Sequence, residues 1–213
     1  AGSAGCVLAD RLSEERNTSL LLLEAGGSDR GLMLKIPAGL SWPLTTGRFN
    51  WNYRTEPEPG MDERRMNCPR GKVIGGSSTI NGMMHARGHA LDFDGWAKND
   101  LPEWSYAHCL PYFKKAETFD RGGDDYRGAS GPLHVTAPRS INPLYGVFLE
   151  AVRQAGYSET ADLNGYRQEG FGVVDQTIRR GRRWSAADAY LRPALKRANL
   201  SLMMNALALR LLF

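Results

Sequence analysis

Residues 70–84 read Arg70-Gly71-Lys72-Val73-Ile74-Gly75-Gly76-Ser77-Ser78-Thr79-Ile80-Asn81-Gly82-Met83-Met84. The two adjacent glycines let a backbone turn tightly and approach a ligand closely, because neither carries a Cβ. The serine hydroxyls and backbone N–H groups that follow suit a pyrophosphate, and we expect a helix to begin near Ser77 or Ser78. Taken alone, this stretch predicts only an anion-binding turn.

A second glycine-containing element opens the chain. Ala1-Gly2-Ser3-Ala4-Gly5 looks like the later part of a G-x-G-x-x-G fingerprint and carries its second and third glycines. The apolar spacing of residues 6–12 predicts a helix, and the four leucines at 20–23 read as a buried parallel strand. Glu24 ends that strand 22 positions after Gly2, about the spacing of an acid that binds a ribose hydroxyl. This order predicts a nucleotide-binding βαβ unit that lacks its first strand and first glycine.

These elements, with segments spread over nearly the whole chain, resemble the glucose-methanol-choline (GMC) family of flavin oxidoreductases. The further matching segments are Leu22–Gly27, Asn50–Pro59, Gly75–Ser78, Ile80–Met83, Arg87–Gly88, Asp162–Tyr166 and Gln168–Gly172. The family signature around Gly75 and Gly76 departs at His85, where an aromatic residue or alanine is usual. The resemblance implies an α/β fold, with an FAD-binding Rossmann-like domain truncated at its first strand and part of an α+β substrate-binding domain.

The resemblance also implies a set of cofactor contacts. The expected FAD-binding residues are Gly2, Ser3, Ala4, Gly5, Glu24, Gly75, Gly76, Ser77, Asn81, Gly82, Met83, Met84 and Leu207. Glu24 would bind the ribose, the alternative being a solvated strand end, and ordinary core packing competes as an explanation for Met83 and Met84. Some family members attach the flavin covalently through a histidine immediately before the asparagine of this stretch. Ile80 stands there instead, so non-covalent FAD is expected.

The catalytic residues stay unknown from this sequence. His85 is a candidate to line the active site, and a half-buried structural histidine is an equal alternative. No Ser-His-Asp, paired-carboxylate or metal-ligand arrangement is legible, and no metal is expected. The family's base is a histidine near the C-terminus of a much longer chain, a position that nothing here occupies. A non-catalytic flavin-binding or interaction fragment is therefore the alternative for this polypeptide by itself.

The activity that the resemblance implies is FAD-dependent oxidation of a primary alcohol to an aldehyde by hydride transfer to flavin. Choline, giving betaine aldehyde, is the favoured substrate, and an aliphatic alcohol is the alternative within the family. The expected partners are the small-molecule alcohol and an electron acceptor of unspecified kind. A nicotinamide-binding Rossmann domain is disfavoured, because it would not explain Gly75-Gly76-Ser77-Ser78.

Composition narrows the remaining classes. The 213 residues are 42% hydrophobic, as in a protein that buries a core, and no apolar run approaches the ~20 residues that span a bilayer. The net charge is +4, and we interpret the basic run at 179–183 as a solvated turn between two strands rather than a nucleic-acid patch. Cys6, Cys68 and Cys109 have neither metal nor disulfide spacing, which favours a reducing compartment. We expect a cytoplasmic protein, with peripheral association with the inner membrane left open.

Composition shifts also divide the chain. We expect residues 1–120 to form the N-terminal part of the FAD-binding domain, 121–180 part of the substrate-binding domain, and 181–213 a return to the FAD-binding domain. The expected helices cover 92–100, 110–118, 143–154 and 185–195, and the expected strands cover 133–135, 173–178 and two stretches within 200–213. The chain has no initiator methionine or signal-like start, and we expect it to be an internal piece of a longer protein.

Overall fold

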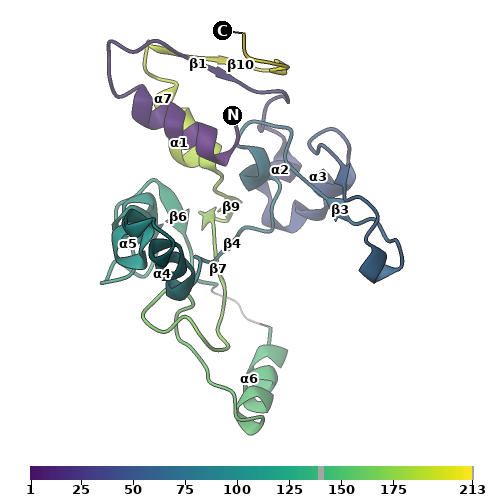
Figure 1. Ribbon diagram of the computed structural model, residues 1–213, viewed down its shortest axis with the longest axis vertical. Helices are drawn as coiled ribbons and strands as arrows, with labels where there is room; N and C mark the ends of the chain where they lie inside the picture. Colours follow the sequence, from purple (N-terminus) through teal and green to yellow (C-terminus); the bar gives the residue numbers. More distant parts are fainter. Residues whose placement is uncertain (139–141, 213) are drawn as a thin grey trace. The chain divides into compact units, whose positions relative to one another are not determined.

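The computed structural model describes residues 1–138 and 142–212, which divide into two compact units (Figure 1). The first unit combines Ala1–Met83 with Arg180–Phe213, and the second is Met84–Arg179. The chain thus enters the second unit well before residue 120 and leaves it close to residue 180. The assignment of segments to FAD-binding and substrate-binding domains stays a prediction.

The first unit contains one long helix and many short elements. Its helices and turns are α1 (Ser3–Leu12), α2 (Leu32–Lys35), η1 (Pro37–Gly39), α3 (Ser41–Thr45), η2 (Pro59–Met61), η3 (Gly76–Thr79), the π-helical η5 (Ala187–Leu191) and α7 (Arg192–Ala194). Its strands are β1 (Leu20–Leu23), β2 (Tyr53–Arg54), β3 (Asn67–Cys68), β9 (Arg182–Arg183) and β10 (Leu200–Met203).

Strands β1 and β10 form a parallel pair, with Leu20 opposite Leu200 and Leu23 opposite Met203. Helix α1 lies beside η5 and α7, below this pair in the view of Figure 1. The predicted parallel strand is confirmed, but it is not fully buried, because Leu21 is 56% exposed and Leu23 is 38% exposed. The apolar side chains of β1 are therefore covered on alternate residues only, in the period-two pattern of a strand with one packed face.

Two elements predicted for the first unit differ in the structure: the helix after the paired glycines is a short 3₁₀ turn, and one strand is absent from the described residues. No helix of several turns follows the paired glycines, because η3 is a single 3₁₀ turn closed by the Thr79 hydroxyl, which donates to the Ile74 carbonyl at 2.7 Å. A turn this short has few aligned peptide dipoles, so α1 is the helix whose N-terminus can attract an anion at this turn. The second strand expected after Asn205 is absent from the described residues 204–212, and Phe213 lies outside the described residues.

Most elements predicted for the second unit are confirmed, with helix boundaries shifted by at most four residues. Its helices and turns are α4 (Ala90–Lys98), η4 (Pro102–Trp104), α5 (Tyr106–Ala116) and α6 (Leu144–Gln154). Its strands are β4 (Met84–His85), β5 (Glu117–Phe119), β6 (Leu133–Val135), β7 (Asp175–Gln176) and β8 (Ile178–Arg179). β5 and β6 pair in parallel, and β4 and β7 pair antiparallel.

No helix within residues 1–138 and 142–212 has both the length and the hydropathy needed to cross a membrane. All three cysteines are free thiols. Burial raises the pKa of the Cys6 thiol to about 11, so this side chain is an inert thiol inside the first unit.

The second unit is organised around the buried guanidinium of Arg127. Its Nη1 donates to Asp162 at 2.8 Å and to Asp175 at 2.8 Å, and its Nη2 donates to Glu117 at 3.0 Å. Arg87 Nη2 donates to the other oxygen of Glu117 at 2.8 Å. Removing one partner from such a buried pair leaves an uncompensated charge, which costs about 3–5 kcal/mol. This network therefore holds β5, β7 and the intervening loops in one arrangement.

The stability of the second unit should depend on pH through Glu117. Burial alone would raise the pKa of this carboxyl, but the nearby His85 imidazole and hydrogen bonds from Arg127 and the Gly128 N–H outweigh it and lower the pKa to about 2. A folded-state pKa below the unfolded value of 4.5 means that the ionised form stabilises the fold above pH 4.5 and that this stabilisation is lost as pH falls toward 2. The contribution corresponds to roughly 3 kcal/mol.

We therefore expect the free energy of unfolding of the full-length protein to fall as pH drops from 4.5 to 2. Denaturant unfolding followed by circular dichroism across this range measures the effect. Glu117→Gln should be less stable at neutral pH, because it removes a buried charge from two arginines, and its stability should decline less steeply with acid. An equally steep decline in Glu117→Gln would assign the acid sensitivity to other carboxylates.

Candidate functional site

The two glycine turns identified in the sequence lie against each other in the first unit. The Gly75 N–H donates to the Ala1 carbonyl at 2.8 Å. A Cβ placed on Gly76 would lie 2.8 Å from Gly2 Cα, closer than real Cβ atoms approach. Gly75 and Gly76 also have φ values of +85° and +55°, which side chains other than glycine's rarely adopt. Sterics and backbone conformation thus both require glycine at this contact.

Helix α1 begins at the same contact. Gly2 is its N-cap, no side chain caps the first turn, and no acidic residue lies in that turn. The first helical hydrogen bond runs from the Cys6 N–H to the Gly2 carbonyl at 2.9 Å, so the helix itself does not use the N–H groups of residues 3–5. A Cβ built on Gly2 or Gly82 would meet no atom within 4 Å, so nothing crowds these positions. The helix therefore presents backbone donors and its positive end, a combination that suits a pyrophosphate.

Glu24 lies beside this turn and is buried, with 6% of its surface exposed. Its Oε1 accepts the Gly26 N–H at 2.8 Å, and its Oε2 is 3.0 Å from the Ala1 amino nitrogen. The Glu24 carbonyl accepts the Ala206 N–H at 2.9 Å, which brings Leu207, 57% exposed, to the same end of the strand pair. The structure thus brings Glu24 to the glycine contact, and its ribose contact stays a prediction.

The residues after the glycines form a chain of local hydrogen bonds. Ser77 Oγ accepts the Gly71 N–H at 3.1 Å, and the Asn81 N–H donates to the Ser77 carbonyl at 2.8 Å. Asn81 Oδ1 accepts the Met83 N–H at 3.0 Å and so supports the φ of +63° at Met83. The Met83 side chain is 2% exposed and packs in the interior, whereas Met84 is 70% exposed. The Met83 side chain therefore packs in the core, and a contact between its backbone and a ligand stays a prediction.

His85 belongs to the second unit and contacts the charge network there. Its Nε2 lies 3.1 Å from Glu117 Oε1, and 17% of its side chain is exposed. This is the environment of a half-buried structural histidine, and a role in an active site stays a prediction. In the part of the chain that the structure describes, no three His, Cys, Asp or Glu side chains gather as a metal site would require.

The prediction of a solvated turn at residues 179–183 is wrong for Arg183. The predicted turn is present, with φ of +51° at Arg180 and +74° at Gly181, but Arg183 is not solvated and is only 1% exposed. Its Nε donates to the Leu34 carbonyl at 3.0 Å, and its Nη1 donates to Asn81 Oδ1 at 2.9 Å. Alternation along β9 explains the error, because Arg182 faces solvent and the next side chain must face the interior.

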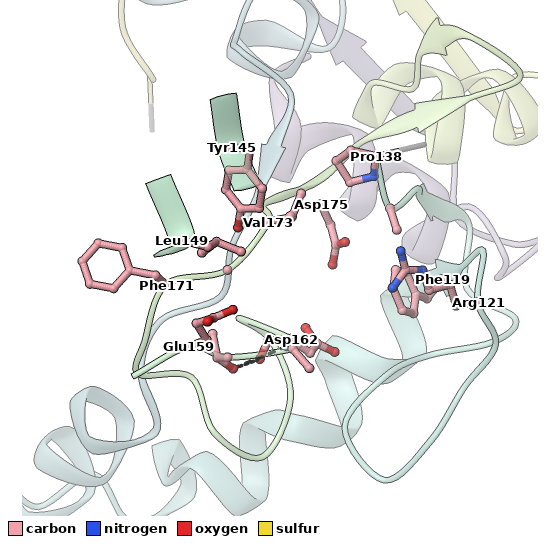
Figure 2. Close-up of a pocket in the computed structure, with 14 residues that line it drawn as sticks. Phe119, Arg121, Pro138, Tyr145, Leu149, Glu159, Asp162, Phe171, Val173 and Asp175 are labelled. Atoms are coloured by element: carbon pink, nitrogen blue, oxygen red, sulfur yellow. Dashed lines mark hydrogen bonds between the residues drawn. The ribbon is translucent and has the colours of Figure 1, made fainter. Parts of the chain in front are cut away.

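The second unit also contains a pocket of about 240 Å³ (Figure 2). Its apolar lining includes Phe119, Tyr145, Leu149, Phe171 and Val173, and its acidic lining is Glu159, Asp162 and Asp175. Arg127 binds both aspartates, and Arg153 Nε donates to Glu159 at 2.6 Å. These carboxylates are thus already engaged by arginines, and the pocket by itself does not define a substrate.

Comparison with known proteins identifies the class. The model of the GMC oxidoreductase family matches residues 1–213, and the chain belongs to this family. Over 203 residues it is 54% identical to the oxygen-dependent choline dehydrogenase of Sinorhizobium fredii, covering 95% of this chain and 37% of that protein. It is 50% identical over 214 residues to the oxygen-dependent choline dehydrogenase of Vibrio vulnificus, covering 100% of this chain and 38% of that protein. The chain therefore spans little more than a third of the length of these curated relatives.

Solved structures confirm the fold. Pyridoxine 4-oxidase from Mesorbium loti superimposes with a TM-score of 0.88 and 36% identity, over 96% of this chain and 40% of that chain. An FAD-dependent oxidoreductase from Chaetomium thermophilum gives a TM-score of 0.86 and 28% identity, over 95% of this chain and 37% of that chain. The family resemblance and the α/β fold expected from the sequence are both confirmed.

The glycine contact should be sensitive to a single methyl group. Gly76→Ala forces alanine into φ +55° with its Cβ 2.8 Å from Gly2 Cα, so the turn must shift. We expect a loss of roughly 1–3 kcal/mol in the free energy of unfolding, measured by thermal or denaturant unfolding of the full-length protein. Gly82→Ala is the matched control, because its Cβ meets no atom, and its stability should stay within about 1 kcal/mol of wild type. Equal stabilities for the two variants would show that the contact is not tight.

Proposed function

We propose that the protein containing this chain is an FAD-dependent alcohol oxidoreductase and that the contact between Gly2 and Gly76 holds the FAD pyrophosphate. The observation that carries the proposal is the N-terminus of α1, which meets the two glycines and has no side-chain cap. An anion at this position would accept backbone hydrogen bonds and gain from the helix dipole. The family membership and the FAD-dependent structural neighbour support the same cofactor.

Each part of the cofactor has a proposed partner in this chain. The N–H groups of Ser3, Ala4 and Gly5 would bind the pyrophosphate, and the Glu24 carboxylate would accept hydrogen bonds from the ribose hydroxyls. Ser77 and Asn81 would contact the pyrophosphate or the edge of the flavin ring. The remaining proposed contacts are Gly75, Gly82, Met83, Met84 and Leu207. When bound, FAD supplies the acceptor for the hydride that leaves the alcohol carbon.

The substrate that we propose is choline, oxidised to betaine aldehyde. The two relatives named above are choline dehydrogenases, and their alignments cover 95% and 100% of this chain. An aliphatic alcohol is the alternative within the family. The base that takes the hydroxyl proton is not assigned to any residue of this chain. For a polypeptide limited to these 213 residues, the alternative is a non-catalytic flavin-binding or interaction fragment.

The cofactor should be bound without a covalent bond. Ile80 occupies the position of the attachment histidine, is 1% exposed, and offers only hydrocarbon. Precipitating the full-length protein with acid should release yellow flavin into the supernatant, where absorbance identifies it as FAD. Flavin that remains in the pellet after washing would contradict the prediction.

Choline should be a better substrate than simple alkanols. A quaternary ammonium is recognised by aromatic faces and carboxylates, which an uncharged alkanol does not need. Steady-state oxidation by the full-length holoenzyme, followed by dye reduction, should give a higher kcat/KM for choline than for medium-chain alkanols. The reverse order would establish the aliphatic alcohol dehydrogenase. Absence of flavin from the purified protein would refute both.

A further inference from the structure

The side-chain amide of Asn81 has a fixed orientation. Its Oδ1 accepts two hydrogen bonds, from the Met83 N–H at 3.0 Å and from Arg183 Nη1 at 2.9 Å. A backbone N–H and a guanidinium can only donate, so exchanging the amide oxygen and nitrogen would place an NH₂ group against two donors. The oxygen must therefore face inward. The Nδ2 group, with two protons, makes no hydrogen bond to the described part of the chain, and Asn81 is exposed.

Arg183 holds this orientation from inside the fold. Its side chain is buried, and besides Asn81 it donates to the carbonyls of Leu34 at 3.0 Å and Ser78 at 3.3 Å. These carbonyl oxygens orient the guanidinium but do not neutralise it. Its Nη2 has no hydrogen-bond partner within residues 1–138 and 142–212. Burial lowers the pKa of Arg183 to about 10, which still leaves it charged at neutral pH.

Among residues 1–138 and 142–212, no carboxylate forms an ion pair with the Arg183 guanidinium. Asp188 is the acidic residue whose charge acts on Arg183, but its oxygens accept from Lys35 at 2.7 Å and from Arg192 at 2.9 Å. The Ser185 hydroxyl donates to the same carboxylate at 2.8 Å. A buried cation without its own counter-ion costs stability.

We propose that Arg183 is a positioning residue that fixes Asn81 so that its Nδ2 protons point outward as donors to an oxygen of bound FAD. This inference rests on the proposed function, and the acceptor is a phosphate oxygen or a ring carbonyl of the cofactor. Arg183 acts through Asn81 and need not touch the cofactor. Its charge also polarises the amide, which strengthens Nδ2 as a donor, because linked hydrogen bonds reinforce one another.

A double-mutant cycle on FAD affinity tests the inference. The dissociation constant of FAD is measured by flavin fluorescence for full-length wild type, Asn81→Ala, Arg183→Met and the double variant. Loss of one hydrogen bond should weaken binding about tenfold in each single variant. The double variant should be no weaker than the weaker single variant, because both changes remove the same donor. Multiplicative losses in the double variant would overturn the inference.

Three further variants separate positioning from a general loss of structure. Asn81→Asp keeps an acceptor for Arg183 but has no donor, so it should bind FAD at least tenfold more weakly, with a melting temperature no lower than that of wild type because its carboxylate pairs with the buried cation. Arg183→Lys keeps a charged donor and should retain more affinity than Arg183→Met. Arg182→Met removes the neighbouring exposed charge and should leave affinity unchanged.

The outcomes are distinguishable. Wild-type affinity in Asn81→Asp would overturn the inference, and so would an equal loss of affinity in Arg182→Met. If Arg183→Met does not fold, Asn81→Asp and Arg183→Lys decide the question. A wild-type protein without FAD would refute the proposed function, whereas FAD bound to wild type with independent effects at Asn81 and Arg183 would refute only the positioning role.

Discussion

The close approach of Gly76 to Gly2 is the constraint on which the first unit depends. A side chain at Gly76 would collide with the backbone that leads into α1, so the two segments can meet only without one. Their meeting fixes where α1 begins, and the hydrogen bond from Gly75 to the Ala1 carbonyl holds that start in place. The Ala1 nitrogen in turn donates to the Leu23 carbonyl at 2.7 Å, which ties the end of β1 to the same turn. Helix, strand end and glycine turn therefore meet at one corner of the first unit.

The guanidinium groups of Arg127 in the second unit and Arg183 in the first unit are both buried, but in different surroundings. In the second unit Arg127 is surrounded by three carboxylates, and these hydrogen bonds raise its pKa despite the opposing effect of burial. Such pairing offsets most of the cost of removing the ions from water, so a structural role accounts for it fully. In the first unit burial lowers the pKa of Arg183, because neutral oxygens surround it. If Arg183 had a structural role alone, nothing would offset the free energy that burying its unpaired charge costs.

Short-range patterns let the sequence predict much of the fold. Helical spacing located α1, α4 and α6, and the leucine run located β1, because each pattern is contained within a few residues. The helix expected after the paired glycines is only the 3₁₀ turn η3. Gly75 and Gly76 both have positive φ, and the serines that follow do not indicate this conformation from the sequence. The burial of Arg183 was also missed. A strand of two residues is too short for alternation to be recognised, and a cluster of arginines usually indicates a solvated turn.

The same limit applies to the candidate site. The order and spacing of residues along the sequence indicated that Gly2, Gly76 and Glu24 belong to a nucleotide-binding pattern. The structure brings them together at one corner of the first unit. The direction of the Asn81 amide could not be predicted, because it depends on Arg183, which lies far away in the sequence. Donors that are already oriented lose little entropy when a ligand arrives, so binding energy is not spent on ordering them. A buried arginine that lowers stability is consistent with this advantage, because it holds the amide in the donating orientation before the cofactor binds.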